Sequence, residues 1–240
     1  MQASVDGIIV PGDEEEETIA LLQEVVEQGI PVVNVLQDST GSIRQCFVGN
    51  NSYNLGQDYG RQILELLAEK EDDNPQEGEP ADVLVLVDET RMDTSQNLIL
   101  LGIRETLEQA ETEVGKVAVE TSPVDNSRSF SSEESIRDIF LNSERLPDIL
   151  VCLSAVHTRC AYQAAVDYNK VGTVQLLGYY DSDAILDAVA KKILYSTIAP
   201  DTEQMGRLCV QALDEYVETG YTNNYMAVDT HLIRAEEAES

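Results

Sequence analysis

One stretch of the sequence, residues 174–206, contains the pattern of strand, polar turn and helix twice in succession. Its apolar opening run has the length of a buried strand and ends at Gly178, after which polar and aromatic residues lead into an amphipathic helix. A second short strand, residues 196–199, ends at Pro200, and Asp201 begins another helix. Strands that end just before helix N-termini are typical of open α/β sheets, in which ligands bind at the carboxyl ends of the strands.

The same alternation of strands and helices runs through the rest of the chain, which predicts parallel sheets covered by helices on both faces. Right-handed crossovers then place the carboxyl ends of all strands of a sheet on one edge. Further strands are expected at residues 5–10, 31–36, 46–49, 82–87, 116–121 and 148–153, most of them followed by a helix.

Six short segments resemble type I periplasmic solute-binding proteins, whose fold is shared by the effector domains of lac-repressor-like regulators. That family carries G-[FY]-[DY]-D-S, T-I-A-Q-D-P and Q-M-G at the spacing at which this chain has GYYDS, TIAPDT and QMG. Nearer the N-terminus, DGIIV, GIPVV and FVGNNSYNLG follow the family pattern. The resemblance implies a two-lobed α/β type I periplasmic-binding-protein fold with parallel sheets flanked by helices and a ligand cleft between the lobes that closes about a hinge.

The acidic segment 69–80, which contains proline and glycine, is the best candidate for a domain boundary. With the return crossings that the resemblance implies, we expect an N-terminal lobe of residues 1–78 plus 201–226 and a C-terminal lobe of residues 79–200 plus 227–240. By the resemblance, the N-terminal lobe is expected to be N-terminally truncated, since it lacks the family's first two strand–helix units. The strand at 5–10 is therefore expected to be an exposed edge through which the chain self-associates.

Composition narrows the classes of function. The chain has 45 acidic and 15 basic residues and a net charge of −30, which argues against nucleic acid as a direct partner because phosphate binding needs clustered Lys and Arg. No run of residues approaches the length of a membrane span. The spacing of Cys46, Cys152, Cys160 and Cys209 is not that of a metal site. A Cys152–Cys160 disulfide and half-buried free thiols are both compatible with the sequence.

No catalytic motif is recognisable. The sequence has no G-x-S-x-G, no P-loop, no G-x-G-x-x-G after a strand and no H-E-x-x-H. The adjacent acids Glu133 and Glu134 do not face each other on a helix. Of the two histidines, His157 follows a strand and is either a ligand contact or an exposed residue at a helix start, and His231 is isolated. We therefore expect a binding protein, not an enzyme, with no catalytic residues, metal or cofactor.

The candidate binding residues are the polar and aromatic residues that follow strands. Amides, carboxylates, an arginine and tyrosine rings suit a small polyhydroxylated ligand, although each residue alone is equally compatible with capping a helix. The resemblance places the family's ligand positions on Asn50, Asn97, Ser154 and Tyr180, while Pro200 replaces a family glutamine. The full candidate set is Asn50, Asn51, Arg91, Asn97, Ser154, Tyr179, Tyr180 and Asp181.

The resemblance implies a solute-binding domain that takes a small polar, sugar-like ligand for ABC-type uptake or for signalling to a membrane sensor. The implied partners are a carbohydrate and an ABC permease or a sensor kinase, and the implied location is extracellular or periplasmic, with a membrane tether. The alternative is a cytoplasmic ligand-sensing effector domain of a lac-repressor-like transcriptional regulator. A third alternative, an enzyme on a similar doubly wound scaffold, lacks a visible pair of nucleophile and base.

Overall fold

The computed structural model describes residues 5–12, 15–39, 41, 43–73, 80–89, 94–110, 116–126, 128–142 and 145–238. The chain divides into two compact units: residues 1–51 with 200–230, called unit 1, and residues 52–199 with 231–240, called unit 2. Each unit has its own sheet. Neighbouring strands from β1 to β9 in the first sheet, and from β8 to β5 in the second, pair in parallel. The expected two-lobed α/β fold is confirmed.

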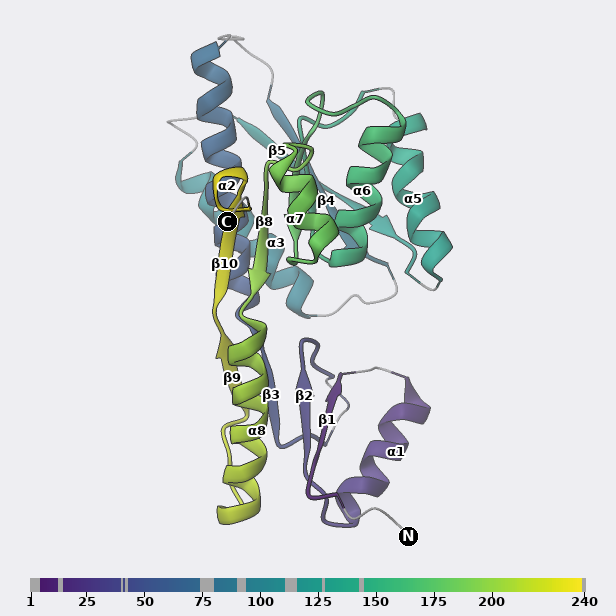
Figure 1. Ribbon diagram of the computed structural model, residues 1–240, viewed down its shortest axis with the longest axis vertical. Coiled ribbons are helices and arrows are strands. Elements are labelled where there is room, and N and C mark those ends of the chain that lie inside the picture. The colour runs from purple at the N-terminus through teal and green to yellow at the C-terminus, as the bar shows by residue number, and fades with distance from the viewer. Residues whose placement is uncertain are drawn as a thin grey trace. The chain divides into compact units, whose positions relative to one another are not determined.

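Unit 1 is built on a parallel sheet of strand order β1-β2-β3-β9 (Figure 1). Helix α8 packs on β2, β3 and β9, where Val33, Val48, Met205 and Met226 form the core. Strand β1 lies at the edge of this sheet, as the sequence predicts, and the side chain of Ile9 is 42% exposed. The elements are β1 (Ile8–Pro11), α1 (Glu16–Glu27), β2 (Val32–Val35), β3 (Cys46–Asn50), α8 (Thr202–Thr219) and β9 (Tyr225–Val228).

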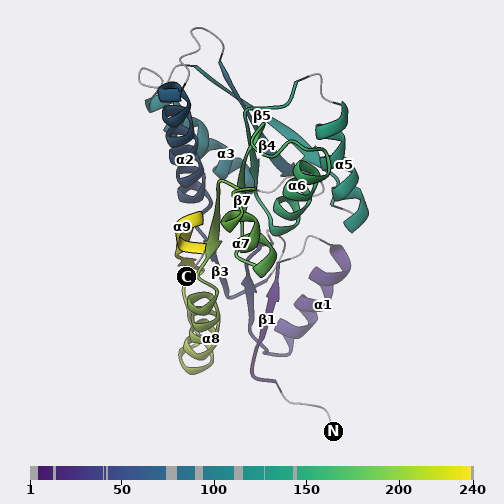
Figure 2. The same cartoon turned by 45° about the horizontal axis from the view of Figure 1, so that its top comes forward.

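Unit 2 has a sheet of strand order β10-β8-β7-β6-β4-β5 with a core on each face. Figure 2 shows α2 and α3 on one side of this sheet and α5 and α6 on the other. The strands are β4 (Ala81–Asp88), β5 (Val117–Val124), β6 (Ile149–Cys152), β7 (Gln175–Tyr179), β8 (Ser196–Pro200) and β10 (Thr230–Arg234). The helices are α2 (Ser52–Asp73), α3 (Thr94–Gln109), α5 (Ser129–Asn142), α6 (Ala155–Asp167), α7 (Asp183–Ala190) and α9 (Ala235–Ala238).

The boundary between the units differs from the one expected after residue 78. It falls after Asn51, because the whole of α2 packs in unit 2. Tyr59 of α2 is fully buried, and its hydroxyl lies 3.1 Å from the carbonyl oxygen of Cys152 and 3.0 Å from that of Gly178. Residues 69–73 of the acidic segment that suggested the boundary form the end of α2, and residues 74–79 lie outside the described residues. The other two crossings fall after Ala199 and after Thr230, whereas the expected bounds were residues 200 and 226.

Polar residues occupy the N-cap positions of two helices that the sequence predicted. The carboxylate of Asp201 caps α8 by accepting a hydrogen bond of 2.7 Å from the backbone N–H of Gln204. Ser182 occupies the N-cap position of α7, and Asp183 is the first helical residue. All four cysteines are free thiols, so the Cys152–Cys160 disulfide is not formed. Within the described residues, none of the helices is long and apolar enough to cross a membrane.

Candidate ligand-binding site

The carboxyl ends of the parallel strands of unit 2 bring polar side chains to one edge of its sheet. Strands β4 to β8 all run in the same direction, so the residues that follow them are neighbours across the sheet. The half-buried residues at this edge are Asp88 at the end of β4, Asn126 after β5, Ser154 after β6, Tyr179 at the end of β7, and Tyr180 and Asp181 after β7. Four of them, Ser154, Tyr179, Tyr180 and Asp181, belong to the set expected from the sequence.

A buried threonine joins the ends of β6 and β7. The Thr158 hydroxyl is fully buried, donates to the carbonyl oxygen of Ser154 at 2.8 Å, and accepts a 2.8 Å hydrogen bond from the backbone N–H of Tyr179. Ser154 itself is the N-cap of α6, and its hydroxyl accepts from the backbone N–H of His157 at 3.1 Å. A Cβ at Gly178 would lie 2.8 Å from Thr158 Cγ2, so glycine permits this close contact. Ser154 therefore caps a helix at the edge where a ligand role was expected.

The two tyrosines at the end of β7 have different backbone conformations. Tyr180 adopts a left-handed backbone with φ of 83°, which is unfavourable for a residue with a large side chain. Two hydrogen bonds to β8 hold it: its N–H donates to Ile198 O at 2.9 Å, and its carbonyl accepts from the Thr197 hydroxyl at 2.7 Å. The rings of Tyr179 and Tyr180 lie 6.5 Å apart and pack partly on opposite cores of unit 2. Both residues are half-buried at the carboxyl edge.

The end of β4 is held by a glutamine that sequence reasoning missed. Gln96 of α3 accepts a 2.7 Å hydrogen bond from the backbone N–H of Asp88 through Oε1. Its neighbour Asn97, which the resemblance selected, is exposed on α3. Arg91, another expected site residue, lies outside the described residues. The sequence signal for Gln96 is its position in the first turn of the helix that follows β4.

The burial of His157 is the second feature of this site that the sequence did not predict. His157 is 2% exposed, and its Nε2 lies 3.1 Å from Nδ2 of Asn126 in the loop after β5. Burial lowers the pKa of His157 to about 4, with Asp88 and the backbone of Leu86 acting in the opposite direction. His157 is therefore neutral at pH 7, and it is not the exposed helix-start residue that was one of its two interpretations.

In unit 1, the expected residues Asn50 and Asn51 mark the end of β3. Asn50 is half-buried and Asn51 is exposed. On the neighbouring strand β2, Leu36 follows the last strand residue with φ of 64°, and its side chain is 47% exposed. Like Tyr180 in unit 2, Leu36 is a large residue with a left-handed backbone just after a parallel strand.

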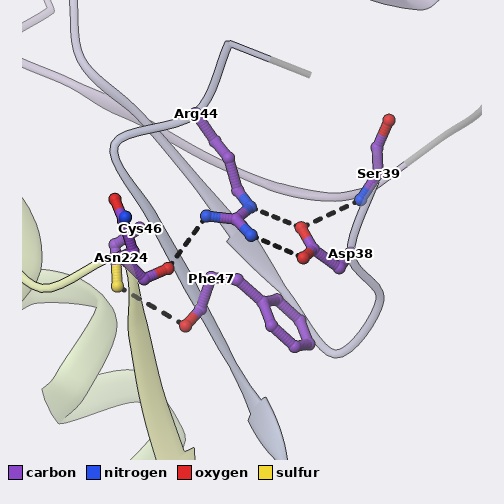
Figure 3. Close-up of polar contacts among 6 residues, drawn as sticks. All are labelled: Asp38, Ser39, Arg44, Cys46, Phe47 and Asn224. Carbon is purple, nitrogen blue, oxygen red and sulfur yellow. Dashed lines mark hydrogen bonds and ion pairs between the residues drawn. The ribbon is translucent and has the colours of Figure 1, made fainter. Parts of the chain in front are cut away.

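The loop between β2 and β3 is held by one arginine (Figure 3). Arg44 forms a two-pronged ion pair with Asp38 and donates to the carbonyl oxygen of Asn224 at 2.8 Å. Its guanidinium carbon lies 5.7 Å from the centre of the Phe47 ring, which in turn stacks on Tyr225 with ring centroids 5.7 Å apart. The carboxyl edge of unit 1 is thus shaped by a loop with several independent restraints.

The arrangement in unit 2 is suited to reversible binding through hydrogen bonds and ring contacts. Carboxylate, amide and hydroxyl groups supply directional donors and acceptors, and the tyrosine rings supply apolar faces. Among the described side chains, no three His, Cys, Asp or Glu residues converge as a metal site would require. Burial raises the pKa of the Cys46 thiol to about 11, so this cysteine is not an activated nucleophile.

Comparison with known protein families identifies the class. Residues 1–221 match the family described as periplasmic binding protein domain. Because this match covers most of the sequence, the chain belongs to that family, a family of binding proteins. No curated protein matches the sequence.

Solved structures show the same fold. The XylFII–LytSN complex is similar with 21% identity and a TM-score of 0.73, over 97% of this chain and 78% of that chain. GanP, a glucose-galactose binding protein from Geobacillus stearothermophilus, has 21% identity and a TM-score of 0.72, over 97% and 78%. An ABC transporter solute-binding protein from Agrobacterium vitis with bound D-fucose has 14% identity and a TM-score of 0.76, over 97% and 76%.

Proposed function

We propose that this protein binds a small neutral carbohydrate at the carboxyl edges of its parallel sheets. The observation that carries the proposal is the gathering of Asn126, Ser154, Tyr179, Tyr180 and Asp181 at one edge of the sheet of unit 2 in a periplasmic binding protein domain. Hydroxyl groups of a sugar pair with amides and carboxylates, and its C–H faces pack on aromatic rings.

The proposed site also includes Asn50 and Asn51 of unit 1 and Arg91. Residues at the ends of strands in both units would then contact one ligand, and closure about the three connecting segments would exclude water from it. This proposal is supported by the family membership and by the position of Asn50 at the end of a parallel strand. A decrease in the radius of gyration on adding ligand, measured by small-angle X-ray scattering, tests the closure.

We further propose that the protein works outside the cytoplasm and passes its ligand, or the signal of its binding, to a second protein. The family description supports an extracytoplasmic site of action. One similar structure is an ABC transporter solute-binding protein, which supports a permease as the second protein. Another is a complex of XylFII with LytSN, which supports a second protein that binds this one directly. Co-purification of the tagged protein from its native membranes, with and without the sugar, tests this part.

Isothermal titration calorimetry with D-glucose, D-galactose and D-fucose tests sugar binding directly. If the tyrosines border the ligand, Tyr179→Ala and Tyr180→Ala should each cost about 2 kcal/mol of binding free energy, because ring area buried against the sugar is lost. The matched control is Tyr221→Ala, since Tyr221 is 71% exposed in unit 1 and far from any strand end of unit 2 in sequence. Absence of binding to all three sugars, or unchanged affinity in both variants, would contradict the proposal.

A further inference from the structure

The contact between His157 and Asn126 joins two loops at the carboxyl edge of unit 2. His157 lies in the first turn of α6, after β6, and Asn126 lies in the loop after β5, with β4 between these two strands. His157 Nε2 is 3.1 Å from Asn126 Nδ2 and 3.3 Å from Asn126 Oδ1. The pair therefore spans the end of β4, where Asp88 lies.

Neighbouring groups determine the direction of this hydrogen bond. The Ser132 hydroxyl, which is buried in α5, donates to Asn126 Oδ1 at 2.6 Å. Nδ2 is the nearer of the two amide atoms to the ring, at 3.1 Å against 3.3 Å for Oδ1, so we assign Nδ2 as the donor to His157 Nε2. The imidazole must then be neutral and carry its proton on Nδ1. Burial favours the neutral ring, since it lowers the pKa of His157 to about 4.

Asn126 is held at both ends of its amide, yet it retains hydrogen-bonding capacity. Ser132 fixes its oxygen, His157 fixes its nitrogen, and the second Nδ2–H has no partner within the part of the chain that the structure describes. The side chain is half-buried at the carboxyl edge of unit 2, where the proposed function places the ligand. A donor with a fixed direction binds a hydroxyl oxygen at a lower entropy cost than a freely rotating amide does.

We propose that Asn126 is a ligand-binding donor of unit 2 and that His157 is its positioning residue, holding the amide so that one N–H is presented to a sugar oxygen. This rests on the proposed function. A histidine that served only to fill the core would be an expensive choice, because a polar ring that is 2% exposed has a desolvation cost that an apolar residue avoids. An apolar residue would fill the same space without this cost, but it would leave the Asn126 amide free to rotate.

Three variants separate positioning from packing. His157→Met keeps the volume but removes the acceptor, and we expect it to weaken sugar affinity about tenfold, the value of one hydrogen bond. His157→Gln restores an acceptor and should recover most of that loss, whereas Asn126→Asp removes the donor and should weaken affinity as much as His157→Met. His231→Met, an exposed histidine in β10, is the matched control and should leave affinity unchanged. Affinities are measured by calorimetry with D-glucose, D-galactose and D-fucose.

A second measurement needs no ligand. Imidazole ¹⁵N NMR at pH 7 should show His157 as the neutral ring with its proton on Nδ1, and His157→Met should shift the side-chain amide resonances of Asn126. An Nε2–H or charged ring, or unmoved amide resonances, would overturn the positioning role even if no sugar binds. Equal sugar affinity in wild type and His157→Met would overturn it as well. If His157→Met fails to fold, the other two variants decide the matter. Weakened sugar affinity in Asn126→Asp together with retained affinity in His157→Gln supports the proposal. Unchanged affinity in Asn126→Asp overturns it.

Discussion

Gly56 of α2 and Gly102 of α3 face each other across a helix pair that has no room for a side chain on either glycine. A Cβ on Gly56 would lie 2.1 Å from the carbonyl oxygen of Ile99 and 3.0 Å from the Cα of Gly102. A Cβ on Gly102 would lie 2.3 Å from the carbonyl oxygen of Tyr53. The two helix backbones are thus in direct contact, and this contact holds α2 in unit 2.

Substitution of Gly56 by alanine should therefore destabilise unit 2. The new methyl group meets backbone atoms, which cannot rotate away, so the helices must separate, and we expect a loss of about 3 kcal/mol in the free energy of unfolding. The matched control is Gly206→Ala in α8, where a Cβ meets nothing within 4 Å. That substitution should raise stability by up to about 1 kcal/mol, because alanine is the better helix former. Urea unfolding followed by circular dichroism measures both, and equal stability of the two variants would contradict the packing argument.

Removal of the arginine at the loop between β2 and β3 should destabilise unit 1. Arg44→Ala leaves the half-buried carboxylate of Asp38 without its ion pair, and we expect a loss of about 2 kcal/mol. Arg44→Lys should recover only part of this, since an ammonium lacks the planar fork that pairs with both carboxylate oxygens. Arg207→Ala is the control, because both partners of the Arg207–Glu203 ion pair are exposed, and it should change stability little. Calorimetric unfolding of the three variants provides the comparison.

The buried His157 should make stability depend on pH in acid. Its pKa is about 4 when folded and near the ordinary 6.5 when unfolded, so below pH 6.5 the unfolded chain takes up the proton first. Its contribution to stability is complete above pH 6.5 and is lost as the pH falls towards 4, by up to about 3 kcal/mol. As the pH falls over this range, wild type should lose stability relative to His157→Gln. His231→Gln provides the control for the many carboxylates that also titrate, and a constant difference between wild type and His157→Gln would contradict the prediction.

The net charge of −30 should make the protein more stable in salt. Repulsion among carboxylates disfavours the compact state, and the screening length falls from about 10 Å at 0.1 M to about 3 Å at 1 M salt. We expect the melting temperature to rise by several degrees over this range. NaCl and KCl should act alike because screening depends on ionic strength, and a melting temperature that is constant or that falls with salt would contradict the argument.

The exposed edge strand β1 should allow self-association at high protein concentration. Its outer backbone groups are unpaired within the described sheet, and Ile9 adds an exposed apolar side chain. Salt should strengthen the association by screening repulsion between the acidic chains. Sedimentation velocity over a wide concentration range measures it, and Ile9→Lys should weaken it. Leu21→Lys, an exposed position on α1, should not, and a monomer at every concentration in high salt would refute the prediction.

The sequence alone determined the order of strands and helices, the parallel sheets and the cap at Asp201. These features depend on residues that are close in the chain, where apolar periodicity and capping chemistry act directly. It also placed Ser154 and residues 179–181 at strand ends, because a polar residue after a buried strand is a local signal. The family resemblance selected Asn97, whereas Gln96 is the residue that contacts the end of β4.

Only the tertiary structure decided which unit α2 joins and which side chains meet at the carboxyl edge. The assignment of α2 depends on the fit of Gly56 against α3 and of Tyr59 against β6 and β7, and an acidic surface segment nearby carries no information on that fit. His157 and Asn126 are 31 positions apart in the sequence. They meet because β5, which precedes Asn126, and β6, which precedes His157, both lie beside β4 in the sheet. Such contacts arise from the order of strands in the sheet, and no local pattern of residues encodes that order.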